Sequence, residues 1–345
     1  MRVEVDLAAA AANWRRFDAL GRAAAVVKAD AYGLGAAPLA RAFAEAGART
    51  FFVATPYEGA AVRDALGWGS DIYVLGGYRQ ADGHLHRTAF LRPVINAPDE
   101  ARAWIDDGRP GAACALHVDT GMNRLGAPMA AVAALAAIDL EPALVMSHLA
   151  CASDPRDPMN AVQLARFRTV AAAFPRAQRS LAASAGALLG PDYAFDLVRP
   201  GIGLYGGEPH DGGASGLAPV ARVFAPVLQV RDIAIGDSVG YGATFRAERP
   251  MRVATIGAGY ADGILRSLSG RGYAVLAGER RPFLGRVSMD LISVDATGLA
   301  VAPGDAADLI GPGLTLETLA AAAGTANYEL LTQLGAATKI YRGRA

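Results

Sequence analysis

This sequence of 345 residues has almost no cysteine and no excess of charge of either sign. Its two cysteines, Cys114 and Cys151, form no CxxC pair and cannot build a disulfide framework. Lysine plus arginine number 33, as do aspartate plus glutamate, so the formal net charge is zero. A neutral chain lacks the broad positive field that attracts nucleic acid, and we expect no such partner. The sequence suggests no metal site.

Long apolar segments are missing as well. The longest, around residues 130–138, is far below the roughly 18 residues that a membrane span needs. Acidic residues occupy the segment Met1–Asp6, where a signal peptide would need an apolar core. We therefore expect a soluble cytoplasmic protein without a membrane partner.

The bulk composition indicates a folded chain. With 52% hydrophobic and 19% charged residues there is ample apolar material to bury, which excludes a disordered or collagen-like protein. A chain of 345 residues exceeds the usual limit for a single core, so we expect two domains.

Lysine is the scarcest charged residue. Only Lys28 and Lys339 are present, and the other 31 basic residues are arginines. Arginine stays protonated in proteins, whereas a desolvated lysine can lose its proton and act as a base or an imine-forming nucleophile. We interpret Lys339 as a surface or packing cation. Lys28 directly follows the apolar run Ala23–Val27, and its surroundings point to chemistry.

Between residues 24 and 206, short apolar runs alternate with alanine-rich amphipathic segments. The runs recur every roughly 20 to 35 residues, the spacing of βα units. They predict a (β/α)8 barrel of the TIM type, with an open, doubly wound sheet as the alternative. The predicted strands are Ala24–Val27, Phe51–Ala54, Ile72–Leu75, Leu91–Ile95, Ala115–Val118, Ala143–Met146, Leu181–Ala183 and Phe195–Val198. The predicted helices include Leu34–Ala46, Tyr57–Leu66, Pro98–Asp107, Pro128–Ile138 and Pro158–Phe174.

The alternation stops after Gly206, and the glycine-rich segment Gly207–Gly216 is typical of a linker. We therefore predict a barrel domain over residues 1–216 and a mostly β domain over residues 217–345. One helix is expected in the second domain, Leu316–Ala323, between caps at Thr315 and Gly324. Its predicted strands are Val220–Arg231, Val239–Phe245, Met251–Ile256, Tyr273–Ala277, Phe283–Val287 and Leu291–Val294.

In a barrel, catalytic groups lie just after the strands, and Lys28 follows the first one. An ammonium group at this rim loses hydration, so its pKa should fall from about 10.4 toward working pH. Such an amine can form a Schiff base. The alternative is an ordinary lysine that extends from the strand end into solvent.

The exits of the last two predicted strands carry the second signal. Ala182–Gly186 and Asp196–Gly206 offer glycine-freed backbone N–H groups and a hydroxyl where many barrels hold a phosphate. Together with an imine-forming lysine they suggest pyridoxal 5′-phosphate (PLP). Alone, each glycine turn is weak, because turns use glycine for backbone reasons.

These residues match a known family. Ala25–Gly35 closely resembles the PLP-lysine signature of the alanine racemases, which are PLP-dependent enzymes of fold type III. Seven further segments resemble this family in the same order along the chain: His117–Gly126, Ser147–Ala150, Val198–Gly206, Gly240–Thr244, Gly259–Arg266, Arg286–Asp290 and Ala326–Glu329.

The resemblance implies an alanine racemase, an isomerase that interconverts L- and D-alanine and supplies D-alanine for peptidoglycan. Lys28 would bind PLP and serve as one acid–base group, and Tyr241 would oppose it across the interface of a head-to-tail homodimer. Arg199 would face the pyridine nitrogen. The resemblance further implies cofactor contacts from Tyr32, His148, Ser184, Gly201, Ile202 and Tyr328, and substrate contacts from Arg124, Met289 and Tyr260, the last at the entrance.

The physical chemistry of these roles is consistent. Racemisation removes a proton from one face and returns one to the other, so two groups on opposite faces are needed. Free lysine and tyrosine have pKa values of about 10.4 and 10, which balances the two directions. An arginine at the pyridine nitrogen leaves that nitrogen unprotonated and restrains side reactions such as transamination. Structural alternatives are a salt bridge for Arg199, a strand-edge aromatic for Tyr241 and a buried histidine for His148.

Three positions depart from the commonest pattern of the family. His117 stands where many alanine racemases have a lysine that becomes carbamylated and orients the arginine seven residues later. Arg124 must then be oriented by His117, a bound anion or water. Ala183 replaces a frequent asparagine, and Ser288 a frequent cysteine. A racemase that prefers serine or another small amino acid is therefore a second hypothesis. A non-catalytic PLP-binding protein is a third, which Tyr241 and Met289 disfavour.

Overall fold

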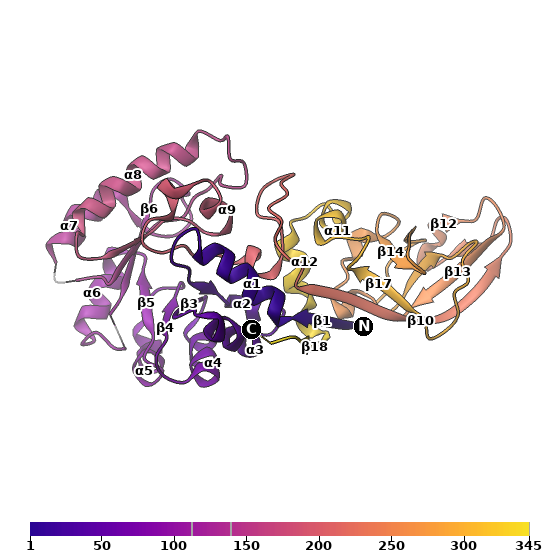
Figure 1. Ribbon diagram of the computed structural model, residues 1–345, viewed down its shortest axis with the longest axis horizontal. Helices are drawn as coiled ribbons and strands as arrows, with labels where there is room; N and C mark the ends of the chain where they lie inside the picture. Colours follow the sequence, from indigo (N-terminus) through magenta and orange to yellow (C-terminus); the bar gives the residue numbers. More distant parts are fainter. Residues whose placement is uncertain (112, 139, 345) are drawn as a thin grey trace. The chain divides into compact units, whose positions relative to one another are not determined.

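The computed structural model describes residues 1–111, 113–138 and 140–344, and these form two compact units (Figure 1). The barrel unit comprises residues 8–31 and 36–218 together with Arg344, and the β unit comprises residues 1–7, 32–35 and 219–343. The sequence placed residues 1–216 in one domain, yet residues 1–7 and 32–35 contact mainly the β unit. No helix of the described residues has the length and apolar character needed to cross a membrane.

A parallel sheet forms the centre of the barrel unit. Its strands follow one another in the order β2 (Ala25–Val26), β3 (Thr50–Val53), β4 (Asp71–Val74), β5 (Arg92–Ile95), β6 (Ala115–Asp119), β8 (Leu144–Met146) and β9 (Gln178–Ser180), with β7 (Ala127–Pro128) beside β6. The eighth position is a segment too short to count as a strand. There Val198 bridges to Ala23 and Arg199 bridges to Ala183, both in parallel. These bridges close the sheet, so the predicted TIM-type barrel is confirmed and the open sheet is excluded.

Helices flank the barrel strands, as Figure 1 shows. They are α1 (Leu7–Asp18), α3 (Ala36–Ala46), α4 (Pro56–Leu66), α5 (Gly83–Thr88), α6 (Pro98–Asp106), α7 (Val132–Ala137), α8 (Met159–Ala173), α9 (Ser184–Ala187) and α10 (Pro191–Ala194). The start of α4 shows why the sequence folds this way. Thr55 caps the helix through a bond from the Glu58 N–H, Pro56 occupies the first turn, and Glu58 returns to the cap backbone.

The barrel core is built from the apolar runs themselves. All four residues of β3 are buried, as are the last three of β4 and of β5. Strands covered on both faces read as continuous apolar runs, which explains why these runs located the strands so well. There are two exceptions. The predicted strand Leu181–Ala183 follows β9, which ends at Ser180 before the chain turns toward α9, and the predicted strand Phe195–Val198 is reduced to the isolated bridge of Val198.

The β unit is an eight-stranded, mainly antiparallel sheet. Its main path is β15 (Glu279–Pro282), β14 (Tyr273–Leu276), β17 (Ala306–Ile310), β10 (Ala221–Ile233), β1 (Arg2–Asp6) and β18 (Thr338–Arg342), with β13 (Met251–Ile256) and β16 (Ile292–Asp295) branching from β10. Strand β10 pairs with β1 and with two further strands. It pairs with β17 over Val223–Pro226 and with β13 over Val227–Ile233, and each of these two ladders contains a register shift.

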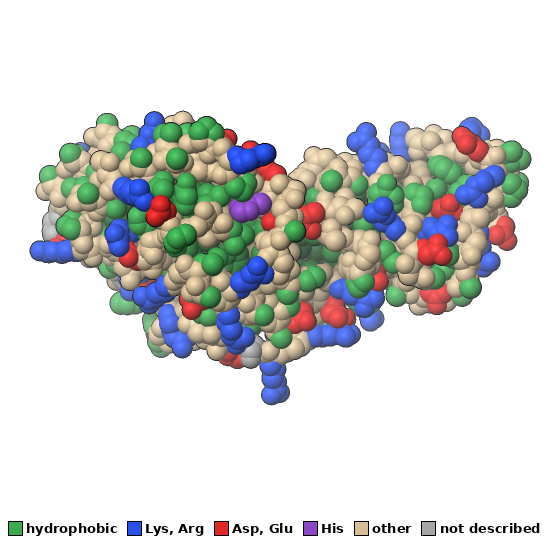
Figure 2. All heavy atoms as spheres, turned by 45° about the horizontal axis from the view of Figure 1, so that its top comes forward, with side chains coloured by type: hydrophobic (Ala, Val, Ile, Leu, Met, Phe, Trp, Pro, Cys, Tyr) green, Lys and Arg blue, Asp and Glu red, His purple; other side chains and the backbone are tan. Residues whose placement is uncertain are grey.

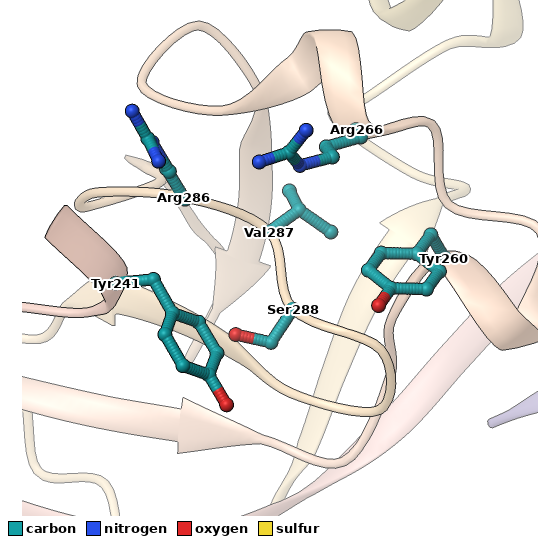
Figure 3. A pocket seen from close by; sticks show the side chains of 6 residues that line it. All are labelled: Tyr241, Tyr260, Arg266, Arg286, Val287 and Ser288. Carbon is teal, nitrogen blue, oxygen red and sulfur yellow. The ribbon is translucent and has the colours of Figure 1, made fainter.

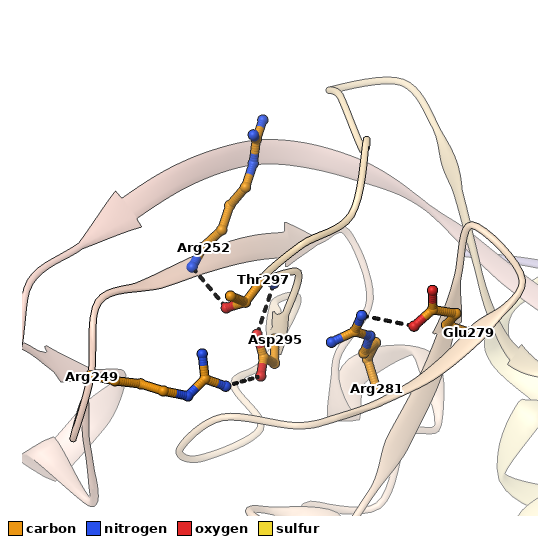
Figure 4. A network of polar contacts seen from close by, with 6 residues as sticks. All are labelled: Arg249, Arg252, Glu279, Arg281, Asp295 and Thr297. Carbon is orange, nitrogen blue, oxygen red and sulfur yellow. Dashed lines mark hydrogen bonds and ion pairs between the residues drawn. The ribbon is translucent and has the colours of Figure 1, made fainter.

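Polar contacts hold the turn after β16, as Figure 4 shows. The largely buried Asp295 carboxylate accepts a bond from the Thr297 N–H at 2.8 Å and one from Arg249 at 3.4 Å. The Thr297 hydroxyl in turn accepts from the Arg252 N–H at 3.0 Å. On the face shown in Figure 2, basic and acidic side chains are interspersed over each unit.

The β unit differs from its sequence-based prediction in two expected strands and in five elements that were not expected. The expected strand Val239–Phe245 is two short strands, β11 (Ser238–Val239) and β12 (Phe245–Arg246), separated by the 3₁₀ turn η4 (Tyr241–Ala243), because Gly240 and Gly242 adopt positive φ. The expected strand Phe283–Val287 is absent. Gly285, at φ 72°, breaks it against the Val239 backbone.

The other differences are five elements that the sequence did not predict. Besides the predicted α11 (Leu316–Ala323), which has the expected caps, there is a second helix, α12 (Asn327–Gln333). Strands β1, β15, β17 and β18 were also not predicted. Strand β1 lies at the opposite end of the sequence from its parallel neighbour β18, a pairing that no local pattern indicates.

Candidate active site

Lys28 lies on a strained turn at the end of the first barrel strand. It opens α2 (Lys28–Tyr32), and Ala29, Asp30 and Ala31 all have left-handed backbone angles, with φ of 52–53°. Each such residue costs an L-amino acid about 1–2 kcal/mol, so the rest of the protein must hold the turn in place. The Ala29 N–H donates to Glu58 Oε1 at 2.8 Å, and the Asp30 carboxylate accepts from the Ala36 N–H at 2.7 Å.

The electrostatic surroundings favour a neutral amine at Lys28. Burial of this half-buried side chain lowers its pKa, the charge of Arg124 lowers it further, and Glu58 acts in the opposite direction. The direction agrees with the expectation from the sequence. Glu58 was not singled out there, although the Thr55–Glu58 segment has the spacing of a capping box.

Arg199 is a buried cation held only by neutral groups. Its Nη1 donates to Ser180 Oγ at 2.6 Å, and its Nη2 donates to the Ser147 carbonyl at 2.7 Å and lies 3.4 Å from His148 Nδ1. In the described part of the chain no carboxylate pairs with it, so the salt-bridge alternative is wrong. Burial lowers the Arg199 pKa to about 9. Desolvation and the charges of Arg199 and Arg124 lower the pKa of His148 well below 6.5, so His148 is neutral.

Ser184 and the glycine turn after the last strand meet as the sequence predicted. Ser184 Oγ accepts bonds from the N–H groups of Gly201 at 2.8 Å and Gly203 at 3.2 Å. Ile202 lies between them and is buried. A side chain at position 203 would stand 2.6 Å from the Phe17 ring, so glycine is needed there for close packing. Backbone N–H groups and a hydroxyl gathered at one point are the donor set of a phosphate site.

His117 and Arg124 belong to β6 and to the loop that follows it. The buried His117 Nδ1 lies 2.8 Å from Asn96 Oδ1. Burial, together with the charges of Arg199 and Arg124, lowers the pKa of His117 to about 4. Asn96 was not recognised in the sequence, because it follows a neighbouring strand 21 residues earlier.

The β unit carries a separate group of predicted site residues. Tyr241 and Tyr260 line a pocket of about 490 Å³, with Ser288 between the two rings (Figure 3). Arg266 and Arg286, which sequence reasoning did not single out, line it as well. Tyr241 is 73% exposed and sits in the turn η4, not at the edge of a strand.

The remaining predicted residues of the β unit fall into two places. The rings of Tyr32 and Tyr328 are 6.1 Å apart, and burial raises the pKa of Tyr32. Met289 is exposed, and its N–H has no hydrogen-bond partner among the described residues. Gly259 packs so closely here that a Cβ would stand 2.2 Å from the Met289 carbonyl oxygen.

Two family models cover almost the whole chain. The model of the N-terminal domain of alanine racemase matches residues 5–209, and that of the C-terminal domain matches residues 220–341. The chain belongs to the alanine racemase family. The resemblance inferred from the sequence is therefore confirmed, and so is the predicted enzyme class, an amino-acid racemase.

Relatives match this alanine racemase family member over nearly their full length. The alanine racemase of Jannaschia sp. is 46% identical over 96% of this chain and 95% of its own. That of Cereibacter sphaeroides is 48% identical, with the same shares covered. The biosynthetic alanine racemase of Agrobacterium fabrum is 44% identical over 97% of this chain and 92% of its own.

Solved alanine racemase structures have the same fold. The Bartonella henselae enzyme with covalently bound pyridoxal phosphate superimposes with a TM-score of 0.93, at 38% identity over 99% of both chains. The biosynthetic enzyme from Pseudomonas aeruginosa gives 0.92, at 35% identity over 99% of this chain and 100% of its own. The three departures from the commonest pattern of alanine racemases lie on β6 (His117), at the start of α9 (Ala183) and in the β-unit pocket (Ser288).

Proposed function

We propose that this member of the alanine racemase family interconverts L- and D-alanine with PLP bound covalently to Lys28. The observation that carries the proposal is the amine of Lys28, which has a lowered pKa and sits on a turn held in a strained conformation at the barrel mouth. Strain of this kind persists only where the surroundings enforce it, and it concentrates at functional sites. The D-alanine would serve peptidoglycan synthesis in the cytoplasm.

The residues present fit the cofactor. Ser184 and the N–H groups of Gly201 and Gly203 lie at one point, where the two N–H groups donate to Ser184 Oγ. With the cofactor bound, they and the Ile202 N–H between them would donate to its phosphate. Tyr32 and Tyr328 would complete the phosphate contacts. The two Nη atoms of Arg199 donate to Ser180 and Ser147, and Nη2 also lies beside His148, whereas the Nε–H bonds to no described residue and would face the pyridine nitrogen. Since arginine does not give up its proton, that nitrogen would stay unprotonated.

Two residues would move the proton. When bound, PLP supplies an electron-withdrawing ring that makes the proton on the substrate Cα removable. The Lys28 amine, made less basic by burial, would exchange this proton on one face. The Tyr241 phenol would exchange it on the other, with the Arg124 guanidinium and the Met289 N–H holding the substrate carboxylate. Tyr260 would sit at the entrance.

We further propose a head-to-tail homodimer in which Tyr241 serves the partner's site. Tyr241, Met289 and Tyr260 are 73%, 57% and 44% exposed in the single chain. A proton-transfer group works best in a preorganised site that excludes water. A second copy of the chain would cover these exposed residues and provide such a site. The net charge of zero does not oppose self-association.

A racemisation assay on a panel of amino acids tests the function. The PLP-loaded protein should interconvert D- and L-alanine with a higher kcat/KM than serine or other small amino acids. Borohydride reduction should bleach the absorbance band and leave the cofactor on the peptide that contains Lys28. Lys28→Ala should lose both the band and the activity, whereas Lys339→Ala should keep both.

Other outcomes would point to the other hypotheses. A higher kcat/KM for serine would identify a racemase of different preference. A protein that binds PLP at Lys28 and racemises nothing would be a binding protein. Attachment at any other residue would defeat the assignment of Lys28 itself.

A further inference from the structure

The amide of Asn96, which follows β5, is 4% exposed and is fixed by hydrogen bonds. Its Nδ2 donates to two backbone carbonyls, those of Val94 at 2.7 Å and Leu75 at 3.2 Å. Both amide hydrogens are therefore used, and Oδ1 must be the atom that faces His117. This oxygen can only accept a hydrogen bond.

The orientation of Asn96 determines the tautomer of His117. Because His117 Nδ1 lies 2.8 Å from an atom that only accepts, Nδ1 must carry the proton. The low pKa of about 4 keeps the ring neutral at working pH. Nε2 then has a free lone pair. No described residue bonds to Nε2, and this atom is not completely enclosed, although the His117 side chain as a whole is buried.

The loop that carries Arg124 returns to the same ring. Asp119 organises the start of this loop by accepting three backbone N–H bonds, each of 2.8 Å, from residues 121–123. At the far end of the loop, a Cβ on Gly126 would stand 3.2 Å from His117 Cε1, the atom between the two ring nitrogens. The exposed Arg124 guanidinium has no hydrogen-bond or ion-pair partner within residues 1–111, 113–138 and 140–344.

We propose that His117 is a positioning residue for Arg124, whose guanidinium donates a hydrogen bond to His117 Nε2. In the single chain these two groups are not hydrogen-bonded to each other or to another described residue, and a movement of the Arg124 side chain, which is carried by the loop that returns to the ring, would pair them. The acceptor is uncharged, so the positive charge of Arg124 stays available for a carboxylate. Asp119, the nearest acid on this element, is already occupied by backbone N–H groups. The proposal rests on the proposed function only in assigning that carboxylate to the substrate.

The tautomer can be observed without any assay of activity. In the PLP-loaded protein labelled with ¹⁵N-histidine, His117 should show a protonated Nδ1 and an unprotonated Nε2, assigned by the loss of its signals in His117→Gln. Arg124→Leu should shift the Nε2 signal toward that of a nitrogen free of hydrogen bonds. A protonated Nε2, or an Nε2 signal indifferent to Arg124→Leu, would overturn the proposal.

Kinetics of two matched variants provide the second arm. A glutamine amide places its oxygen near the position of Nε2, whereas an asparagine amide reaches only the position of Nδ1. We expect His117→Asn to raise KM for alanine about tenfold with a smaller change in kcat, and His117→Gln to stay close to wild type. A purely structural role would reverse this order, because only asparagine keeps the contact with Asn96. Thermal unfolding of both variants checks the fold.

These readouts separate the two proposals. If the wild-type protein fails to racemise alanine while the histidine signals behave as expected, the proposed function fails and the contact between His117 and Arg124 stands. If racemisation is confirmed but the order of the two variants is reversed, only the positioning role is lost.

Discussion

Lys28 is one of only two lysines in the chain, and its amine can take a role that arginine cannot. Thirty-one of the 33 basic residues are arginines, which cannot act as neutral amines at working pH. The barrel mouth extends this division of labour. Arg199 and Arg124 remain cations there, and both lower the pKa of neighbouring histidines, so His117 and His148 are neutral. Positive charge is thus concentrated on groups suited to binding anions.

His86 is a buried histidine outside this site. It is fully buried against Tyr78, with ring centroids 5.4 Å apart, and neither ring nitrogen makes a well-formed hydrogen bond to the described residues. Burial lowers its pKa, while the Leu91 backbone acts in the opposite direction. A group of this kind stores a penalty that should be visible in the stability of the protein.

We therefore predict that acid destabilises the protein through His86. Its pKa is lower in the folded chain than the value of about 6.5 expected in the unfolded chain, so the unfolded state binds more protons as the pH falls. The contribution of neutral His86 to the free energy of unfolding is fully present above about pH 6.5 and is lost progressively as the pH falls below that value. His86→Leu should raise the free energy of unfolding in urea by about 1 kcal/mol at pH 7.5 and flatten its decline toward pH 5.

The matched control for this prediction is the exposed His84, two residues earlier on the same helix. His84→Gln should leave both the value and the slope unchanged. A pH profile of His86→Leu that runs parallel to wild type would mean that the acid sensitivity comes from other groups.

At the scale of elements, the left-handed turn after Lys28 is the least ordinary feature. Helices α4 and α3 hold it from two sides, through Glu58 and through the N–H of Ala36. Glu58 therefore has two functions. One carboxylate oxygen holds the turn through the Ala29 N–H, and the other accepts from the Ala54 N–H at 2.6 Å, at the start of α4. The turn that follows Lys28 is therefore tied to the start of α4.

Glycine substitutions should reveal the strain in this turn. Ala29→Gly removes the Cβ that penalises φ 53°, so we expect the free energy of unfolding to rise by up to about 1 kcal/mol. Ala165→Gly, at an exposed position inside α8, should lower it by about 1 kcal/mol. Urea unfolding of the two variants measures both. Equal losses in the two variants would show that the turn is not strained.

At the scale of the whole molecule, the central prediction is that two chains share each active site. Mixtures of Lys28→Ala and Tyr241→Ala chains, each inactive alone, should regain up to about a quarter of wild-type activity, because a hybrid dimer contains one intact site and half of all dimers are hybrids after random exchange. Racemisation rates before and after subunit exchange measure this gain. If hybrids form, as shown by two differently tagged chains, and no activity returns, each chain carries a self-contained site.

The sequence by itself determined the barrel, because the strands of a parallel sheet covered on both faces are continuous apolar runs that need no tertiary information to recognise. It also located Lys28 and the two strand exits that carry Ser184 and Gly201, since strand ends in a barrel meet at one rim. The resemblance to the family supplied Arg199, Tyr241 and Met289.

Tertiary structure alone decided the rest. Glu58 and Asn96 come from elements remote in sequence, and each acts by accepting a hydrogen bond from a residue 29 or 21 positions away. The pairing of β1 with β18 and the left-handed turn at Ala29 likewise depend on neighbours that the local sequence does not specify. The periodic pattern of buried residues is visible in the local sequence, whereas the partner of a single polar group is determined only when distant segments pack together.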